Sequence, residues 1–478
     1  MVGTPPVPPG RASGPGSRSS PGIQELVVTD LSRIRLRSAT RRRWVATAAV
    51  STVLVLPATG CGAGSEVGES SADVTCDIDV PTEPVTVNIL AYNSTATDPF
   101  TNALTANCGS DTLELKHPAT DLAGQKQRAV QSLSGNTASY DLIEQFGTVY
   151  PLYAARGWTA PLDDYIDTYA DRYHLDDIDP KLMATHAYEG HQYGLPTYWS
   201  VNHLVYREDI FDSLGLDAPT TFEELRQAAE TIQEAGVVEH PLAVPMSPSN
   251  DIQGLFGQAL RSLGGDYFEE GEPVPTLDTP EAVEAVNEVR SLMPYMSPQV
   301  MSFSSPEVTT QLQTGQAAMG FLVSGRLGPL VDETKSPHAN DFAFATPPSV
   351  REGGTPLSFL STDGFAVATN SQADPELLFQ LAAVATGEEA AASVIPEALP
   401  ARLDLLEDAD IPFAANAVET LEEVDPQPLT PVPYMADVYS VIGAPLGDAF
   451  AGDRPVQAAL DEAQAAAVQA IEDGGYAD

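Results

Sequence analysis

From residue 85 onward, short apolar runs alternate with segments whose apolar residues recur at helical spacing. The runs at 85–91, 112–116 and 141–143 favour strands, and helices are expected over about 98–107 and 121–133. Such alternation is typical of layered α/β folds, in which helices cover the faces of a sheet. We therefore predict an α/β protein with mixed, mostly parallel sheets.

Start and stop signals place further helices in the second half of the chain. Thr221 is followed three positions later by Glu224, the capping pattern of a helix N-terminus. Pro280 opens another apolar face, and a last helix over 456–471 precedes a pair of glycines. The chain has 478 residues, 43% of them hydrophobic, and is expected to form two cores, since single cores rarely exceed about 300 residues.

Residues 1–60 are predicted to be a leader that includes a signal peptide. Arginines at 41–43 precede an apolar stretch over 44–56, which is too short to span a bilayer core of roughly 30 Å as a helix. The sequence Ala58-Thr59-Gly60-Cys61 then resembles a bacterial lipobox. This resemblance implies a lipid-modified Cys61 that anchors the protein to the outer face of the cell membrane. An ordinary signal-peptidase site with an incidental cysteine is the alternative.

The segment after the leader is polar and rich in Gly, Ser and Glu. Residues 61–84 are therefore interpreted as a tether between the membrane and the folded domain. Cys76 and Cys108 flank the first predicted strand and helix. Because exported chains sit in an oxidising compartment, this pair favours a disulfide over a metal or redox site.

The chain is strongly acidic. It has 67 Asp and Glu residues against 23 Lys and Arg, a formal net charge of −44. Such a surface repels nucleic acids and anionic lipid headgroups, so no nucleic-acid partner is expected. We interpret the acidity as a device for solubility.

Motifs that carry enzyme chemistry do not occur in the sequence. It has no G-x-S-x-G elbow, no phosphate-binding G-x-x-x-x-G-K-S/T loop and no C-x-x-C pair. His186, Glu189 and His191 lie close together, but their spacing matches neither H-E-x-x-H nor its inverse. No catalytic residue, metal or cofactor is therefore predicted, and the protein is not expected to be an enzyme.

Several stretches, in the expected order, resemble the extracellular solute-binding proteins of ABC importers, in the branch that includes maltose-binding protein. The resemblance covers roughly four fifths of the chain. It is carried by YDLI at 140–143, PLDDYI at 161–166, YGLPTYW at 193–199, LVYREDIF at 204–211, SLGGD at 262–266, GQAAMG at 315–320 and DGFAV at 363–367.

The resemblance implies a two-lobed periplasmic-binding-protein fold with hinge crossovers at Gly194–Pro196, Gly320 and Gly364. The first lobe would take 76–196 plus 321–364, and the second 197–320 plus 365–478. Such a monomer captures a solute, here a sugar or oligosaccharide, in the cleft. It closes on the solute by a hinge motion and delivers it to the permease subunits of the importer.

The same resemblance implies the positions of the binding residues. A sugar is gripped by aromatic faces and by polar groups that satisfy its hydroxyls. The aromatic pair Tyr198-Trp199 stands where the family places stacking residues, and the ends of strands supply polar groups. The other candidate ligand-binding residues are Asn93, Ser94, Glu144, Gln145, Ser324, Arg326, Asp363 and Gly364. The sequence has no Trp after Gly325, where relatives commonly carry one, so a ligand smaller or more polar than maltose is expected.

Two alternatives remain open at this point. The same fold can bind a cationic solute such as a polyamine or a metal, with several carboxylates lining the cleft. A surface glycosidase is the other alternative, because a chain so rich in carboxylates contains pairs suited to glycoside hydrolysis by chance.

Overall fold

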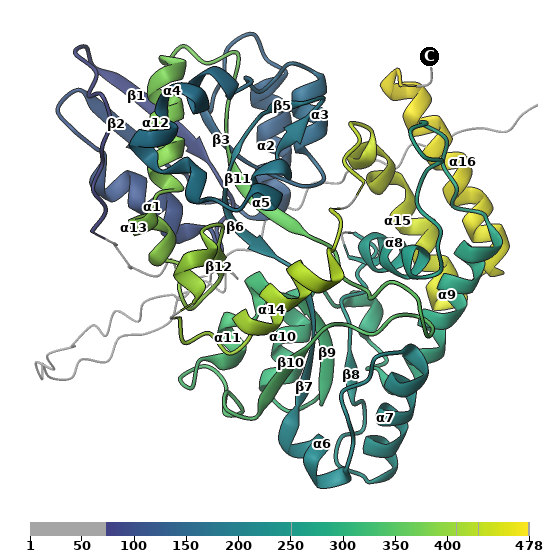
Figure 1. The fold of residues 1–478 in the computed structure, drawn as a ribbon. Coiled ribbons are helices and arrows are strands. Elements are labelled where there is room, and N and C mark those ends of the chain that lie inside the picture. Colours follow the sequence, from purple (N-terminus) through teal and green to yellow (C-terminus); the bar gives the residue numbers. More distant parts are fainter. Residues whose placement is uncertain (1–72, 250, 408, 429, 477–478) are drawn as a thin grey trace, which may run out of the picture. The chain divides into compact units, whose positions relative to one another are not determined.

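The computed structural model describes residues 73–249, 251–407, 409–428 and 430–476. Residue contacts separate 1–63 from 64–478, and the described residues all belong to the second of these units. The predicted leader, signal peptide and Cys61 lie outside the described residues. Two main sheets organise the described part of the chain (Figure 1).

The first sheet has the strand order β12-β6-β11-β3-β1-β2. Its strands are β1 (Val85–Leu90), β2 (Leu113–Lys116), β3 (Leu142–Phe146), β6 (Leu195–Ser200), β11 (Ser361–Val367) and β12 (Leu399–Pro400). Its helices are α1 (Asp98–Asn107), α2 (Leu122–Leu133), α3 (Tyr150–Ala155), α4 (Asp163–Tyr173), α5 (Pro180–Ala184), α12 (Pro375–Ala385) and α13 (Glu388–Ala392). A short hairpin of β4 (Ala187–Tyr188) and β5 (His191–Gln192) precedes β6.

The second sheet has the strand order β10-β7-β9-β8. Its strands are β7 (Asn202–Arg207), β8 (Leu242–Ala243), β9 (Met319–Val323) and β10 (Phe342–Ala345). The helices on this side are α6 (Glu208–Leu214), α7 (Phe222–Glu234), α8 (Ile252–Ser262), α9 (Pro280–Leu292), α10 (Ser305–Gln313), α11 (Gly328–Val331), α14 (Ala414–Glu419), α15 (Met435–Ala451) and α16 (Val456–Gly474).

Both sheets are mixed, as expected. Strand β1 pairs parallel with β2 and β3, and β8 pairs parallel with β9. The strands nearest the passage between the sheets, β6, β7, β9 and β11, pair antiparallel with one another or with their neighbours. Among the described strands antiparallel pairings therefore outnumber the parallel ones that we expected to dominate. The reason is that the chain passes repeatedly from one sheet to the other and returns in the opposite direction.

The sheets divide the chain at other points than those expected. Strand β6 continues into β7 with only Val201 between them, so the first crossover lies at 200–202 and not at 194–196. Strand β10 and residues 321–323 of β9 belong to the second sheet, although 321–364 was assigned to the first lobe. Strand β12 and residues 365–367 of β11 belong to the first sheet, although 365–478 was assigned to the second lobe. Pro196, Gly320 and Gly364 lie inside strands β6, β9 and β11, so these positions are not the crossovers.

Local signals explain where the helices begin and end. The side chain of Thr221 accepts a hydrogen bond from the Glu224 amide at the start of α7, and Thr279 caps α9 in the same way. These bonds satisfy amides that have no partner inside the helix. Helix α16 ends at Gly475, whose φ of 74° is the left-handed conformation that glycine adopts without strain.

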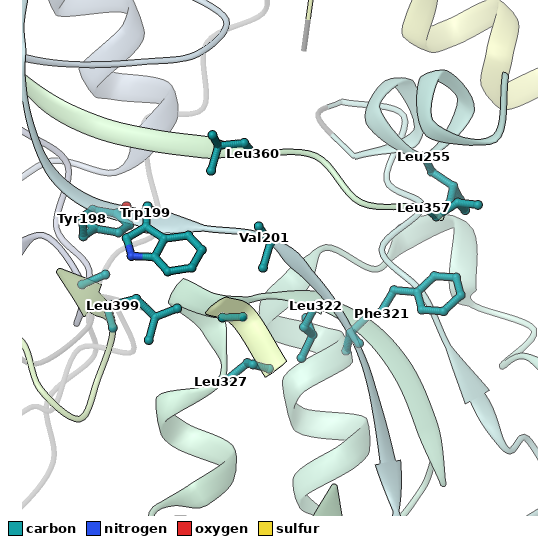
Figure 2. Packing of buried hydrophobic residues seen from close by; sticks show 14 of the residues in the cluster. Tyr198, Trp199, Val201, Leu255, Phe321, Leu322, Leu327, Leu357, Leu360 and Leu399 are labelled. Atoms are coloured by element: carbon teal, nitrogen blue, oxygen red, sulfur yellow. The ribbon is translucent and has the colours of Figure 1, made fainter. Parts of the chain in front are cut away.

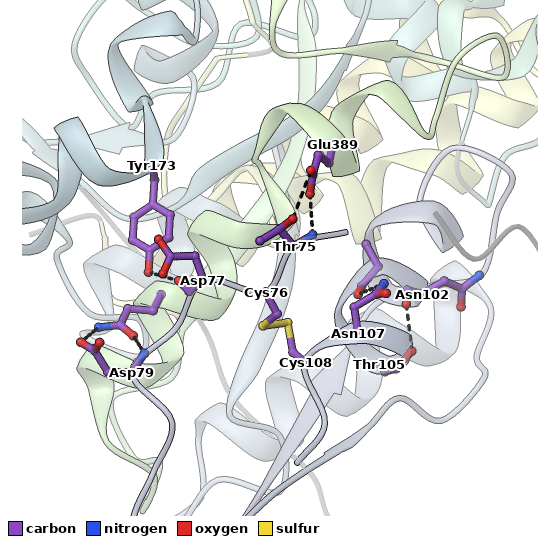
Figure 3. Close-up of a disulfide and its surroundings, with 12 residues drawn as sticks. Thr75, Cys76, Asp77, Asp79, Asn102, Thr105, Asn107, Cys108, Tyr173 and Glu389 are labelled. Carbon is purple, nitrogen blue, oxygen red and sulfur yellow. Dashed lines mark hydrogen bonds between the residues drawn. A yellow bond between two sulfur atoms is a disulfide. The ribbon is translucent and has the colours of Figure 1, made fainter. Parts of the chain in front are cut away.

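The segment before β1 is attached to the first sheet and its helices, which corrects the expectation of a tether extending to residue 84. Cys76 forms a disulfide with Cys108 at the end of α1 (Figure 3). The carboxylates of Asp77 and Asp79 pair with Arg172 on α4, at 2.9 and 3.3 Å. Charge and covalent attachment thus hold residues 76–79, polar though they are, on the folded body.

Candidate functional site

A cavity of about 280 Å³ lies where the two sheets meet. Residues from both sheets line it, mostly at or near strand ends. The first sheet and its connections contribute Tyr92, Ser94, Lys126, Phe146, Tyr198, Ser200 and Asp363. The second side contributes Asn202, Asp251, Leu255, Gln258, Phe321, Arg326 and Tyr439.

Three side chains from separate strands of the first sheet meet in the cavity wall. Tyr92 lies two residues after the end of β1, Tyr198 lies on β6 and Asp363 lies on β11, opposite Tyr198 in the strand register. The Asp363 Oδ2 atom accepts hydrogen bonds from the hydroxyls of Tyr198, at 2.7 Å, and Tyr92, at 3.0 Å. The two tyrosine oxygens are 2.8 Å apart. All three side chains are buried.

Burial dominates the electrostatics of this cluster. It raises the pKa of Asp363 to about 6, although the two hydroxyl hydrogen bonds act to lower it. Burial also raises the pKa of the Tyr198 and Tyr92 hydroxyls, and the charge of Asp363 adds to this effect. A pKa of about 6 lies above the usual range of Asp.

Two cationic side chains face the cavity. Lys126 on α2 has its Nζ atom 5.3 Å from the centre of the Phe146 ring, and burial lowers its pKa. Arg326 follows β9 on a turn whose Gly325 amide donates to Ser200 Oγ at 3.0 Å. Within the described residues Arg326 makes no hydrogen bond or ion pair, although its charge acts on Asp363. Its guanidinium therefore offers donors to a ligand.

Four of the candidate residues line the cavity: Ser94, Tyr198, Arg326 and Asp363. Trp199 does not, which corrects the expectation of an aromatic platform. Neighbouring residues of a strand point to opposite faces of the sheet, so the indole points away from the Tyr198 side of β6. It is completely buried in the core cluster that also holds Leu399 and Leu327 (Figure 2).

The candidates after β1 and on β3 have structural roles. Asn93 accepts a hydrogen bond from the Thr120 amide and donates to Asp98, so it joins two loops. Glu144 accepts from the Tyr92 amide at 3.0 Å, and Gln145 donates to the Tyr193 carbonyl at 3.0 Å. None of the three lines the cavity. Glu144 is buried, and burial together with the charge of Asp363 raises its pKa well above the usual range.

Ser324 and Gly364 also lie outside the cavity lining. The Ser324 hydroxyl is 2.8 Å from His203 Nε2 and its amide donates to the Val201 carbonyl at 3.0 Å, so it joins β7 to the turn after β9. Gly364 sits at a β-bulge where an added Cβ would lie 2.3 Å from the Leu195 carbonyl oxygen. Only glycine fits there, and the bulge keeps Asp363 opposite Tyr198.

Sequence reasoning missed several residues of the cavity, among them Tyr92, Lys126, Gln258 and Tyr439. A signal existed for Tyr92, which follows the first strand at the same sheet edge as Ser94. A weaker one existed for Lys126, because cations are scarce in this chain. Nothing in the sequence marks Gln258 and Tyr439, which reach the cavity only through the packing of α8 and α15.

Neither a cluster of metal ligands nor a membrane-spanning helix occurs in the described part of the chain. Over these residues no group of three or more His, Cys, Asp and Glu side chains is arranged to hold a metal ion. None of the described helices is both long and apolar enough to cross a membrane.

Two mixed sheets joined by crossovers, with a cavity between them that charged and apolar side chains line together, define a class of proteins that enclose a small solute between two α/β lobes. A family model for bacterial extracellular solute-binding proteins matches residues 120–392. This match covers more than half of the chain, and the chain belongs to that family.

Known relatives support the assignment. A mannitol-binding protein of Pseudomonas aeruginosa is 26% identical over 366 residues, which cover 72% of this chain and 82% of that protein. An ABC transporter solute-binding protein of Agrobacterium radiobacter, solved in complex with ribitol, has a TM-score of 0.71 at 23% identity over 81% of this chain and 99% of its own. A counterpart from Agrobacterium vitis with bound D-mannitol has a TM-score of 0.68 at 21% identity over 82% and 100%. These two structures establish the two-lobed fold.

Proposed function

We propose that this protein is the solute-binding component of an ABC importer and that it captures a polyol or a single sugar outside the cytoplasmic membrane. The observation that carries the proposal is the cavity of about 280 Å³, lined from both sheets by charged groups, hydroxyls and amides. This volume is at the lower end of small-molecule sites, which favours a ligand of monosaccharide size over an oligosaccharide. The mannitol and ribitol bound by relatives have this size and chemistry.

The polar groups suit a ligand covered with hydroxyls. A hydroxyl both donates and accepts, so its site needs acceptors and donors side by side. Asp363 supplies an acceptor, and Arg326 supplies donors from the turn after β9. A cationic solute is disfavoured by Arg326 and Lys126, which stand in the same cavity as the carboxylates.

We propose hinge closure about the crossovers as the mechanism of capture. The lobes would comprise 73–200 plus 361–400, and 202–345 plus 414–476, with Val201 in the first crossover. Ligand that touches both sides of the cavity stabilises the closed state by its contacts with each. The closed form then delivers the solute to the permease.

The proposal includes attachment to the outer face of the membrane through lipid on Cys61. It is supported by the basic and apolar residues before Ala58-Thr59-Gly60-Cys61. Mass spectrometry of the mature N-terminus tests it. A diacylglycerol on Cys61 is expected, and a mature chain that starts elsewhere without lipid would contradict it.

Calorimetric titration of the mature protein with mannitol, ribitol, glucose, maltose and putrescine tests the solute class. Micromolar binding of a polyol or hexose, about −8 kcal/mol, is expected. The variant Arg326→Gln should weaken it, and Arg351→Gln should not, because Arg351 pairs with Glu284 away from the cavity. Binding of putrescine alone would replace the proposal by the cationic alternative. Release of reducing ends from oligosaccharides would replace it by a glycosidase.

A further inference from the structure

The three oxygens in the cavity wall form a closed ring. Tyr198 Oη, Tyr92 Oη and Asp363 Oδ2 are separated by 2.7, 2.8 and 3.0 Å, so each pair is at hydrogen-bond distance. The side chains come from three different parts of the first sheet and are buried, so the surrounding fold holds the ring together.

Counting protons shows that this ring is incomplete when Asp363 is ionised. Each hydrogen bond needs one proton between its two oxygens, and three contacts need three. The two phenols supply two, and a carboxylate supplies none. One contact then brings two lone pairs together in a buried setting, which is unfavourable. One further proton on Asp363 allows all three contacts to be hydrogen bonds.

The groups around the ring have opposite effects on the pKa of Asp363. Arg326 on the turn after β9 and Lys126 on α2 favour the ionised carboxylate. Burial opposes them and prevails, since it raises the pKa of Asp363 to about 6. Glu144 on β3 accepts a hydrogen bond from the Tyr92 amide, and the negative charge of Asp98 on α1 contributes to raising the pKa of Glu144. Burial and the charge of Asp363 raise the pKa of Glu144 well above its usual range, so the two carboxyl groups influence each other's ionisation.

We propose that this ring is a proton-binding site in the wall of the solute cavity and that a neutral polyol displaces the proton on binding. The displacement of this proton by a polyol rests on the proposed function. Within the described residues Asp363 Oδ1 makes no hydrogen bond, so a solute hydroxyl can donate to it. An ionised carboxylate is the stronger acceptor. Binding therefore favours loss of the Asp363 proton to the buffer.

The expected dependence on pH follows from linkage. Above the titration midpoint of Asp363 no proton needs to leave, and solute affinity is at its maximum. Below this midpoint the affinity falls as the pH decreases, and the loss approaches tenfold for each pH unit, because the proton and the solute compete for Asp363. In Asp363→Asn this dependence disappears. In Glu144→Gln it remains, since the three oxygens of the ring are unchanged.

Carbon-13 NMR of the aspartate carboxyls in the solute-free mature protein tests the proton site by itself. The resonance absent from Asp363→Asn should titrate near pH 6, well above the other aspartates. A midpoint in the usual range of Asp would overturn the proton site.

Calorimetry with mannitol between pH 5 and 8, in buffers of different ionisation enthalpy, tests the linkage. Release of a fraction of a proton in the wild type and in Glu144→Gln, but not in Asp363→Asn, is expected. Affinity independent of pH in the wild type would overturn the linkage. If no polyol or sugar binds at any pH, the proposed function fails, and the NMR titration still decides the proton site.

Discussion

The two sides of the cavity are built differently. On the first-sheet side, Tyr92, Tyr198 and Asp363 form a buried cluster whose charge depends on pH. On the other side, the amides of Asn202 and Gln258 bond to each other, and the Asn202 amide also donates to the Leu357 carbonyl at 3.2 Å.

Apolar groups complete the second side. Leu255 and Phe321 lie there in the buried cluster shown in Figure 2. The difference suggests a division of labour: the first side orients a solute through the Asp363 carboxylate, and the second closes over it with the Arg326 donors, satisfied amides and apolar surface. The following predictions test this comparison, from the largest expected effect to the smallest.

The first side depends on a disulfide. Replacing Cys76 and Cys108 by serine should lower the free energy of unfolding by roughly 3 to 4 kcal/mol, because the chain between them gains entropy when unfolded. Hydrogen exchange should rise in β1 and α1 and stay unchanged in β7 and β9. Equal acceleration on both sides would show that the two sides do not differ in this respect.

Asp363→Asn should weaken polyol binding at pH 8 by about 2 to 3 kcal/mol, or roughly 30- to 150-fold, since a hydrogen bond to a charged group is lost. Titration calorimetry measures this. Unchanged affinity would show that the first side does not orient the solute through this carboxylate.

The same variant should raise stability at pH 8 by roughly 1 to 3 kcal/mol. The pKa of Asp363 is raised in the folded protein, so its stabilising contribution is fully present below its unfolded value of 3.8. It is lost as the pH rises through about 6.

Buried His186 and His203 act in the opposite sense. Burial lowers their pKa values to about 3 and 4, so their contribution is present above pH 6.5 and lost in acid. The difference between variant and wild type in urea unfolding, measured at pH 4 and at pH 8, therefore isolates Asp363. A difference of the same size at both values would contradict its raised pKa.

Gln258→Ala on the second side should weaken binding by about 1 kcal/mol, roughly fivefold, because Asn202 loses its partner. Calorimetry at pH 8, beside Asp363→Asn, makes the comparison direct. A loss as large as that of Asp363→Asn would remove the distinction between the two sides.

The smallest effect on affinity is expected behind the first side. Trp199→Phe should leave solute affinity within about twofold, while the cavity left by the smaller ring lowers the unfolding free energy by about 1 to 3 kcal/mol. Tyr198→Phe is the matched variant on the cavity side, and it should weaken binding more. A larger loss of affinity in Trp199→Phe than in Tyr198→Phe would show that Trp199 belongs to the binding site.

Much of the fold was predictable because its signals are local. The predicted helix over 98–107 coincides with α1, and the strand over 85–91 differs from β1 by one residue. Asp121 accepts from the Gly124 amide at the start of α2, and Thr221 caps α7 in the same way. Such hydrogen bonds join residues that are close together in the chain, so the sequence alone can predict them.

The candidate site was only partly predictable. Asp363 and Tyr198 were found because they lie within chain segments that resemble the family. The predictions that Trp199 and Ser324 contact the ligand failed, because a shift of one position along a strand or turn reverses the direction in which a side chain points. The prediction that Gly364 contacts the ligand failed as well, because glycine stands there for steric reasons at a β-bulge.

The sequence by itself determined the alternation of elements, their caps, the family and the cysteine pair. Only the tertiary structure decided where the chain passes between the sheets and which side chains reach the cavity. The physical reason is that helix and strand formation depend on neighbours in the chain. A cavity wall, by contrast, joins Tyr92, Tyr198 and Asp363, residues more than a hundred positions apart, whose meeting depends on packing alone.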